Sequence, residues 1–258
     1  MKISVIIPMF NAENTIVEAL DSVVNQSFDG FYDVWIIDDG SSDNSVSVVH
    51  DYISKFNDQN FKFTLLSQKN QGVAKARNMA LMRATGDWVA FLDADDAWHP
   101  RKIEIMSSFF SDTYSVIGHS SALKKAAVII PSVDQIKIKE ISYVSVLLKN
   151  CFVTPGVVIK NEKKLFNEKM RFTEDHEFWL RLLHRKKGLF VNVPLVHLNR
   201  PVLSKGGLSS SIWKMRKGEI FMYSNIYRYN KKAIFFVPFL VLFSLLKCVK
   251  LYFFNQAR

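Results

Sequence analysis

The chain has 258 residues, 48% of them apolar, which is enough to bury a sizeable core and predicts a globular protein rather than a disordered one. Its two cysteines, Cys151 and Cys248, form no Cys-x-x-Cys pair, which argues against a disulfide framework or a structural zinc site. The net charge is +10, and residues 200–258 hold eleven of the 34 lysines and arginines but one of the 24 acidic residues. The first apolar run stops at Pro8, too early for a signal-peptide core, so we expect a cytoplasmic protein.

The first 110 residues alternate short apolar runs, typical of strands, with segments of helical periodicity. The expected strands cover 3–7, 34–37, 61–66 and 89–92, and the expected helices cover 15–24, 46–56, 73–84 and 103–110. A repeated strand–helix order predicts a parallel sheet covered by helices. Ligands of such a sheet bind beyond the carboxyl ends of its strands, so the polar residues there are the first candidates for a site.

Beyond residue 110 the alternation becomes irregular. Strand candidates lie at 116–118, 127–130, 157–160 and 189–193, and a helix is expected at 174–184. We interpret this region as the second half of the same mixed sheet, which gives one Rossmann-like α/β domain over residues 1–200. Residues 201–258 are expected to form a basic and apolar helical tail.

An acidic turn follows the strand expected at 89–92. Asp93 and Asp95 stand two residues apart in an extended stretch, so both side chains can face one cation. A magnesium or manganese ion needs only one or two protein carboxylates when a diphosphate supplies further oxygens. An isolated Asp-x-Asp is more often a solvated turn, but the presence of Asp39 at the end of another strand favours a cation site.

Four polar residues have local interpretations. Asp39 is predicted to accept hydrogen bonds from a nucleotide base or ribose, whereas Asp43 is predicted to cap the helix that follows it. Thr173 can cap the helix that begins with acidic residues at 174–177, where the helix dipole favours carboxylates. His176 belongs to no His-Glu-x-x-His pattern, so zinc ligation is not expected.

Five motifs, taken together and in order, resemble the family 2 glycosyltransferases over about residues 1–200. They are Ser4–Asn11, Ile37–Asp43, Gly72–Asn78, Gly86–Asp96 and Glu174-Asp175. The resemblance implies a GT-A type fold and inverting transfer from a nucleotide-activated sugar, with a nucleotide-binding half over 1–110 and an acceptor and catalytic half over 111–200. No Gln-x-x-Arg-Trp motif follows Asp175, so a processive polymerase is disfavoured.

The same resemblance implies roles for individual residues. The contacts it implies with the nucleotide sugar are Pro8, Asn11, Asp39, Arg77, Asp93, Arg200 and Ser209. Asp95 would hold the divalent cation, Mn²⁺ or Mg²⁺, and Asp175 would be the general base that takes the proton of the acceptor hydroxyl. The stretch from Arg200 to Ser209 is equally consistent with a plain glycine-containing loop.

We therefore expect a non-processive, inverting glycosyltransferase that moves one sugar from a nucleoside-diphosphate sugar, with uridine as the expected base. The expected acceptor is a hydroxyl of a lipid-linked or other saccharide in surface polysaccharide biosynthesis. One alternative is a metal-dependent nucleotidyl- or phosphotransferase, which would release pyrophosphate. Another is a catalytically inactive nucleotide-sugar-binding module at the membrane, which would bind the donor without transferring it.

The tail contains an apolar run at 233–246 between clusters of lysine and arginine. A membrane-spanning helix needs about 20 apolar residues, a length reached here only by including two lysines. We therefore expect residues 228–254 to lie on the anionic inner face of the cell membrane, with a helix packed on the domain as the alternative. A nucleic-acid partner is not expected, because the aromatic residues are contiguous instead of spaced among the cations.

Overall fold

The structure is a computed structural model that describes residues 1–124, 128–201 and 211–256. Nine strands in these residues form one sheet: β1 (Lys2–Met9), β2 (Phe31–Asp38), β3 (Phe61–Ser67), β4 (Trp88–Phe91), β5 (Ala97–Trp98), β6 (Tyr114–Leu123), β7 (Ile138–Ile141), β8 (Val157–Lys160) and β9 (Lys187–Leu198). The α-helices are α1 (Ile16–Val24), α2 (Ser45–Lys55), α3 (Val73–Leu81), α4 (Lys102–Ser107), α5 (Tyr143–Leu148), α6 (Glu174–Leu182), α7 (Ile212–Asn225) and α8 (Val237–Gln256). Short 3₁₀ turns are η1 (Val133–Gln135), η2 (Thr154–Gly156), η4 (Ile226–Arg228) and η5 (Lys231–Phe236).

The sheet has the order β3-β2-β1-β4-β8-β6-β9-β5, with β7 paired to β9. β1 to β4 are parallel neighbours in this order, whereas β8 runs antiparallel to both β4 and β6. The mixed α/β sheet expected from the sequence is therefore confirmed. The strand expected at 127–130 is wrong for 128–130, which have no regular structure: Ile129 is 91% exposed, and Ile130 packs against the core without pairing in the sheet.

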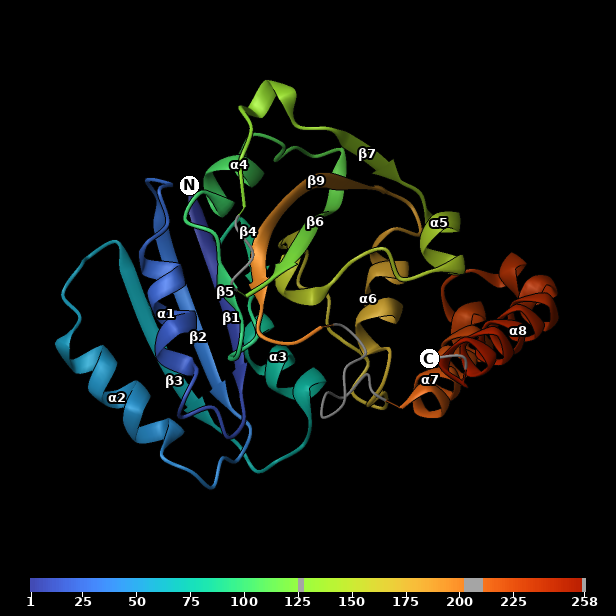
Figure 1. The fold of residues 1–258 in the computed structure, drawn as a ribbon, viewed down its shortest axis with the longest axis horizontal. Coiled ribbons are helices and arrows are strands. Elements are labelled where there is room, and N and C mark those ends of the chain that lie inside the picture. The colour runs from blue at the N-terminus through green and yellow to red at the C-terminus, as the bar shows by residue number, and fades with distance from the viewer. Residues whose placement is uncertain (125–127, 202–210, 257–258) are drawn as a thin grey trace.

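Helices cover both faces of the sheet (Figure 1). On one face, α1 buries Ile16, Leu20 and Val23 against apolar residues of the parallel strands. On the other face, the buried residues of α3 and α6 pack together in a second cluster, which also contains Met222 and Tyr223 of α7. The helix α7 is thus part of the packed body of the protein.

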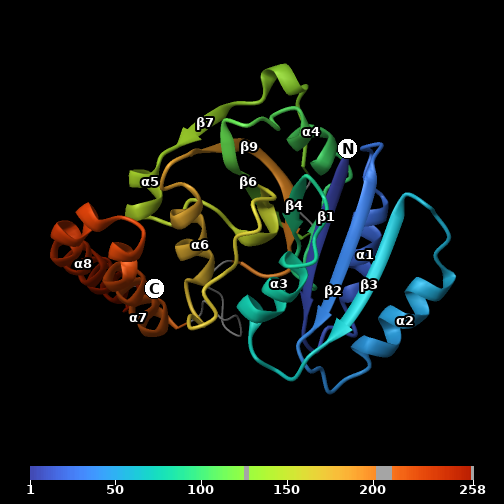
Figure 2. The ribbon, with the colours of Figure 1, turned by 180° about the vertical axis from the view of Figure 1, so that it is seen from behind.

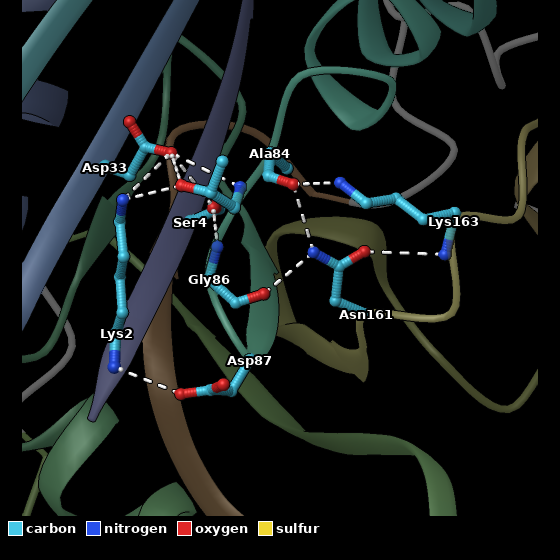
Figure 3. A network of polar contacts seen from close by, with 9 residues as sticks. Lys2, Ser4, Asp33, Ala84, Gly86, Asp87, Asn161 and Lys163 are labelled. Atoms are coloured by element: carbon cyan, nitrogen blue, oxygen red, sulfur yellow. Dashed lines mark hydrogen bonds and ion pairs between the residues drawn. The ribbon is translucent and has the colours of Figure 1, made fainter.

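A network of polar contacts fixes the amino-terminal end of β4 beside β1 (Figure 3). The buried carboxylate of Asp33 accepts a hydrogen bond from Ser4, whose hydroxyl oxygen accepts one from the backbone N–H of Gly86 at 2.9 Å. Asn161 donates to the carbonyl of Gly86 at 2.7 Å. A Cβ at Gly86 would lie 2.4 Å from the backbone nitrogen of Ser4, so only glycine allows this approach. The network holds β4, and therefore the acidic turn at its far end.

The C-terminal helices α7 and α8 lie together at one end of the molecule, next to α5 and α6 (Figures 1 and 2). The buried carboxylate of Glu219 on α7 contacts Arg216, accepts a hydrogen bond from Ser244 at 2.5 Å and pairs with Lys247 of α8 at 2.5 Å. Such a paired and hydrogen-bonded buried charge joins the two helices firmly. No helix within the described residues is both long enough and apolar enough to cross a bilayer.

Helix α7 also packs directly against the turn that precedes α6. A Cβ at Gly218 would lie 2.5 Å from the carbonyl oxygen of Phe172 and 2.5 Å from Oγ1 of Thr173. Thr173 has a positive φ of 58°, which few non-glycine residues adopt. The C-terminal region therefore supports the start of α6, where Asp175 lies.

Candidate active site

The carboxyl ends of β1 and β2 are joined by side chains of the loops that follow them. Pro8 pairs with Ile37 near the end of the two strands. Asn11, with a positive φ of 48°, accepts a hydrogen bond through Oδ1 from the backbone N–H of Ser42 at 2.9 Å. Its own N–H donates to the hydroxyl of Ser41 at 2.9 Å. The two loops are therefore held together at the edge where the sequence predicts the nucleotide.

Asp39 is buried at this same edge, and three donors fix its carboxylate. Oδ1 accepts hydrogen bonds from the side chain of Gln68 at 2.7 Å and from the N–H of Gln71 at 2.8 Å. Oδ2 accepts one from the N–H of Gly72 at 2.8 Å. The carboxylate thus links β2 to the start of α3, the helix that carries Arg77.

One capping prediction is confirmed and one is wrong. Helix α2 begins after Asn44, and Oδ1 of Asp43, one residue earlier, accepts the first helical N–H, that of Ser45, at 3.0 Å, so Asp43 supplies the capping hydrogen bond. Thr173 precedes α6 but does not cap it, because its left-handed backbone turns the side chain away and Oγ1 donates to the carbonyl of Phe172 instead. In the first turn of α6 the N–H of His176 is satisfied by Asp175.

The acidic turn after β4 presents two partly exposed carboxylates. Asp93 accepts a bond from the Arg77 guanidinium at 2.8 Å, and Asp95 pairs with Arg200 at 2.8 Å, each with about a third of its side chain exposed (33% for both). The structure therefore brings together Asp95 and Arg200, which are 105 residues apart in the sequence. Ser209, the other residue predicted in that stretch, lies outside the described residues.

Asp96, the third acidic residue of the turn, faces inward. It is buried, and its Oδ1 accepts the N–H of Asn199 at 2.9 Å. Burial, together with the negative charge of Asp93, raises the pKa of Asp96 to about 8, because both disfavour ionisation. Asp96 thus differs from the two outward-facing carboxylates of the turn in its burial, which is the main cause of its raised pKa.

Arg77 connects the acidic turn to α6. Its side chain is buried, and the guanidinium lies between Asp93 at 2.8 Å and Glu174 at 3.4 Å. The cation also lies over the ring of Phe166, with 5.5 Å from Cζ to the ring centroid. These carboxylates hold the pKa of Arg77 above its usual value against the opposing effect of burial. A fixed positive charge thus stands between the two acidic parts of the site.

Asp175, the predicted base, is positioned by residues from outside its own helix. Its Oδ2 accepts a hydrogen bond from Asn150 at 2.9 Å and a long one from Thr154 at 3.4 Å. Its Oδ1 accepts the N–H of His176 at 2.7 Å. Three donors therefore fix the orientation of the carboxylate.

The neighbouring Glu174 is buried beside Asp175. Burial is the main cause that raises the pKa of Glu174 to about 7, with the charge of Asp175 adding to it and that of Arg77 opposing it. The site therefore contains two adjacent carboxyl groups with different environments. Such a difference is typical of sites where acidic groups have distinct tasks.

The donor set at the acidic turn fits a magnesium or manganese ion. Its ligands would be hard carboxylate oxygens, with no thiolate or imidazole among them, as these ions prefer. No group of three or more histidine, cysteine, aspartate or glutamate side chains within the described ranges could enclose an ion. An ion at Asp95 would therefore complete its coordination with phosphate oxygens and water.

Some residues of the site carry no local signal in the sequence. Asn150 and Thr154 come from the irregular region before β8, 25 and 21 residues upstream of the carboxylate they contact. Only the folded chain brings them to Asp175. Glu174 could have been singled out, because it is the first residue of the Glu174-Asp175 motif.

Comparison with known proteins identifies the family. The family model described as glycosyl transferase family 2 matches residues 4–125. A protein of Haemophilus influenzae named as an uncharacterized glycosyltransferase is 31% identical over 220 residues, covering 82% of this chain and 85% of that protein. The chain belongs to glycosyl transferase family 2 and is a glycosyltransferase.

Two other proteins resemble this family 2 glycosyltransferase. The Escherichia coli protein named UDP-Glc:alpha-D-GlcNAc-diphosphoundecaprenol beta-1,3-glucosyltransferase WfgD is 30% identical, over 83% of this chain and 82% of that protein. The crystal structure of S. aureus TarS 1-349 in complex with UDP-GlcNAc superposes with a TM-score of 0.67 at 22% identity, covering 89% of this chain and 68% of that one. The structural likeness establishes the GT-A fold, as the sequence predicts.

Proposed function

We propose that this glycosyltransferase moves a single sugar from a UDP-sugar to a hydroxyl of a lipid-linked saccharide, with inversion at the anomeric carbon, in surface polysaccharide biosynthesis. Asp175 is the general base, and Asp95 holds a Mn²⁺ or Mg²⁺ ion. Pro8, Asn11, Asp39 and Asp93 line the site of the nucleotide sugar.

The observation that carries this proposal is the arrangement around Arg77. Its guanidinium bridges Asp93, at the predicted sugar and ribose contact, and Glu174, the residue next to the predicted base. The acidic turn and the base thus belong to one connected cluster, although 80 residues separate Asp95 from Asp175 in the sequence. An inverting transfer needs both in one site, because attack and departure occur at opposite faces of one carbon.

In this reaction the acceptor hydroxyl attacks the anomeric carbon while the bond to the nucleoside diphosphate breaks. Asp175 takes the hydroxyl proton, and the three donors on its carboxylate keep it aimed at the acceptor. Arg200, partly exposed beside Asp95, donates to the oxygens of the leaving diphosphate. A bound divalent cation supplies further positive charge to stabilise those oxygens.

The donor and the acceptor are inferred from what similar proteins are named for. The S. aureus structure contains UDP-GlcNAc, and the Escherichia coli relative is named for transfer from UDP-Glc to a diphosphoundecaprenol-linked GlcNAc. These names support a uridine donor and a lipid-linked acceptor. Membership of the glycosyltransferase family also disfavours the two alternatives, a nucleotidyl- or phosphotransferase and an inactive binding module.

Incubation with UDP-sugars, manganese and lipid-linked or short saccharide acceptors tests the reaction. We expect UDP as the released product and, by NMR of the anomeric proton, a linkage of opposite configuration to the donor. Chelation of the cation with EDTA should abolish transfer, and added manganese should restore it. Release of pyrophosphate, or a product that retains the donor configuration, would refute the proposed reaction.

We further infer that the enzyme works on the cytoplasmic face of the cell membrane, docked through its C-terminal segment. The segment exposes a dense group of apolar side chains, whose largest exposed fractions are those of Phe235 (77%), Phe239 (71%) and Phe236 (61%). Soluble proteins seldom expose such a group without a partner. Arg228, Lys231 and Lys232 precede it and favour an anionic surface.

Replacing Phe235 and Phe239 with serine should release the protein from vesicles that contain phosphatidylglycerol. Each buried phenylalanine contributes about 1.5–3 kcal/mol, so the double variant should bind at least about tenfold more weakly in a sedimentation assay. Thermal stability should hardly change, because both side chains are exposed in the free protein. Unchanged vesicle binding would exclude this surface as the docking site.

A further inference from the structure

A cavity of about 280 Å³ lies between α6, the segment that leads to it and the C-terminal turn η4. Lys169 comes from the segment before α6, Glu177 and Arg181 come from α6, and Arg228 and Tyr229 come from η4 and the residue after it. The cavity is distinct from the site around Asp175, none of whose residues lines it. Its wall combines the catalytic helix and the proposed membrane-docking segment.

The cavity has an excess of positive charge. Glu177 pairs with Arg181 through two contacts, at 3.0 and 3.1 Å, so these two charges neutralise each other. Lys169 and Arg228 are exposed and have no ion-pair partner within the described ranges. The residues outside those ranges include no aspartate or glutamate. Two positive charges therefore face the cavity without a neutralising side chain.

The cavity wall also includes a tyrosine with an unsatisfied hydroxyl. The hydroxyl of Tyr229 is buried and has no hydrogen-bond partner among the described residues. An unpaired buried polar group costs about 1–3 kcal/mol, which a bound oxygen ligand can offset. Burial is the main cause that raises the pKa of Tyr229, with Tyr143 and then Glu177 adding to it and Arg181 opposing it.

The position of the cavity indicates which anion it takes. Arg228 is separated by two residues from η5, the turn that carries the exposed Phe235 and Phe236. The chain thus passes directly from the cavity wall into the turn that exposes these apolar side chains, which favours an anion that belongs to a lipid. A lone phosphate group is also small enough for a cavity of about 280 Å³.

We propose that this cavity binds the phosphate group of an anionic membrane lipid, and so fixes the orientation of the catalytic helix at the membrane surface. The proposal extends the membrane docking inferred above and rests on it for the source of the phosphate. Lys169 and Arg228 supply the charge-assisted hydrogen bonds. Non-specific attraction of a basic segment to an anionic surface would not need a cavity at all.

A pair of charge-reversal variants separates these two kinds of attraction. Lys169→Glu with Arg228→Glu changes the cavity, and Lys231→Glu with Lys232→Glu makes the same change in net charge outside it. Sedimentation with phosphatidylcholine vesicles, with and without phosphatidylglycerol, measures the binding. We expect the cavity variant to bind the anionic vesicles at least about tenfold more weakly than the control variant, as the loss of charged hydrogen bonds predicts. Equal losses in the two variants would overturn the proposal.

Titration with glycerol 1-phosphate and with inorganic phosphate, followed by NMR, tests the cavity without a membrane. The native protein and the control variant should bind glycerol 1-phosphate, and the cavity variant should not. If the native protein binds it selectively but ignores vesicles, the docking proposal fails and the phosphate site stands. If the phosphate compounds bind all three proteins equally, or none, the cavity proposal fails whatever the vesicles show.

Discussion

Replacing Asp175 with asparagine should lower kcat by about 10²–10⁴-fold, the usual contribution of a general base. The amide keeps the size of the side chain and can still accept through its oxygen, but it cannot take the proton of the acceptor. The KM for the donor should change little, since the proposed site of the donor is the acidic turn. Steady-state kinetics with varied donor and a saturating acceptor measures both constants.

Asn150→Ala provides the companion measurement. It removes a 2.9 Å hydrogen bond to the Asp175 carboxylate but leaves the carboxylate itself in place. Hydrogen bonds to charged groups contribute about 1.5–3 kcal/mol, so a fall in kcat of about tenfold is expected, much smaller than that of Asp175→Asn. An Asp175→Asn enzyme with normal turnover would remove Asp175 from the role of base.

The sequence predicts the parallel half of the fold well, because its strands and helices bury regular apolar faces. The runs at 3–7, 34–37, 61–66 and 89–92 correspond to β1, β2, β3 and β4. The prediction of strands is weaker where the apolar pattern of the sequence does not match the burial of the residues in the structure. The run at 128–130 has the apolar pattern of a strand but exposes Ile129 and joins no strand, while β7 has exposed residues through most of its length and owes its formation to pairing with β9.

The residues of the candidate site also fall into two groups, those that can be predicted from the sequence and those that cannot. Residues that follow strand ends, such as Asp39 and Asp93, can be found by position, because the carboxyl edge of a parallel sheet collects them. Contacts between distant segments cannot be found in this way. A role for Arg200 was expected only through the family resemblance, and neither its pairing with Asp95 nor the contact of Asn150 with Asp175 was predicted.

The C-terminal region differs most from its description as a tail. Its helix α7 packs against the turn before α6, with Gly218 in close approach to Phe172 and Thr173. The helix that leads into the proposed membrane-docking segment therefore also supports α6, which carries the predicted base. The sequence motifs place a domain boundary near residue 200, and this boundary stays a prediction. Removal of the residues after it would expose the buried face of α6.

Arg77→Met should be the most destabilising of the substitutions considered, with a cost that rises to about 3–5 kcal/mol at a pH high enough to ionise Glu174. Methionine has a similar length, but its loss of charge leaves Asp93 and the buried Glu174 without their cation. Removal of one partner from a buried ion pair has a cost of this size because the remaining charge stays desolvated. Urea unfolding of the native and variant proteins measures the difference.

The cost of Arg77→Met should also grow with pH. The pKa of Glu174 is about 7 in the folded protein and lower when unfolded, so the folded state holds the extra proton in this interval. Stability therefore falls as pH rises towards about 7, by at most about 1.4 kcal/mol per unit, and this fall ends once Glu174 ionises beside Arg77. In Arg77→Met no cation favours ionisation, so the pKa rises further and the fall continues above pH 7.

The double variant Arg77→Met with Glu174→Gln tests whether Glu174 is the carboxyl group that causes this pH dependence. Glutamine cannot ionise, so the part of the destabilisation that increases between about pH 6 and pH 9 should disappear, while a pH-independent part due to Asp93 and lost packing remains. If Arg77→Met instead destabilises the protein equally across this pH range, Glu174 is not the group whose ionisation Arg77 favours. The cycle thereby measures how strongly one buried arginine couples the acidic turn to the helix of the base.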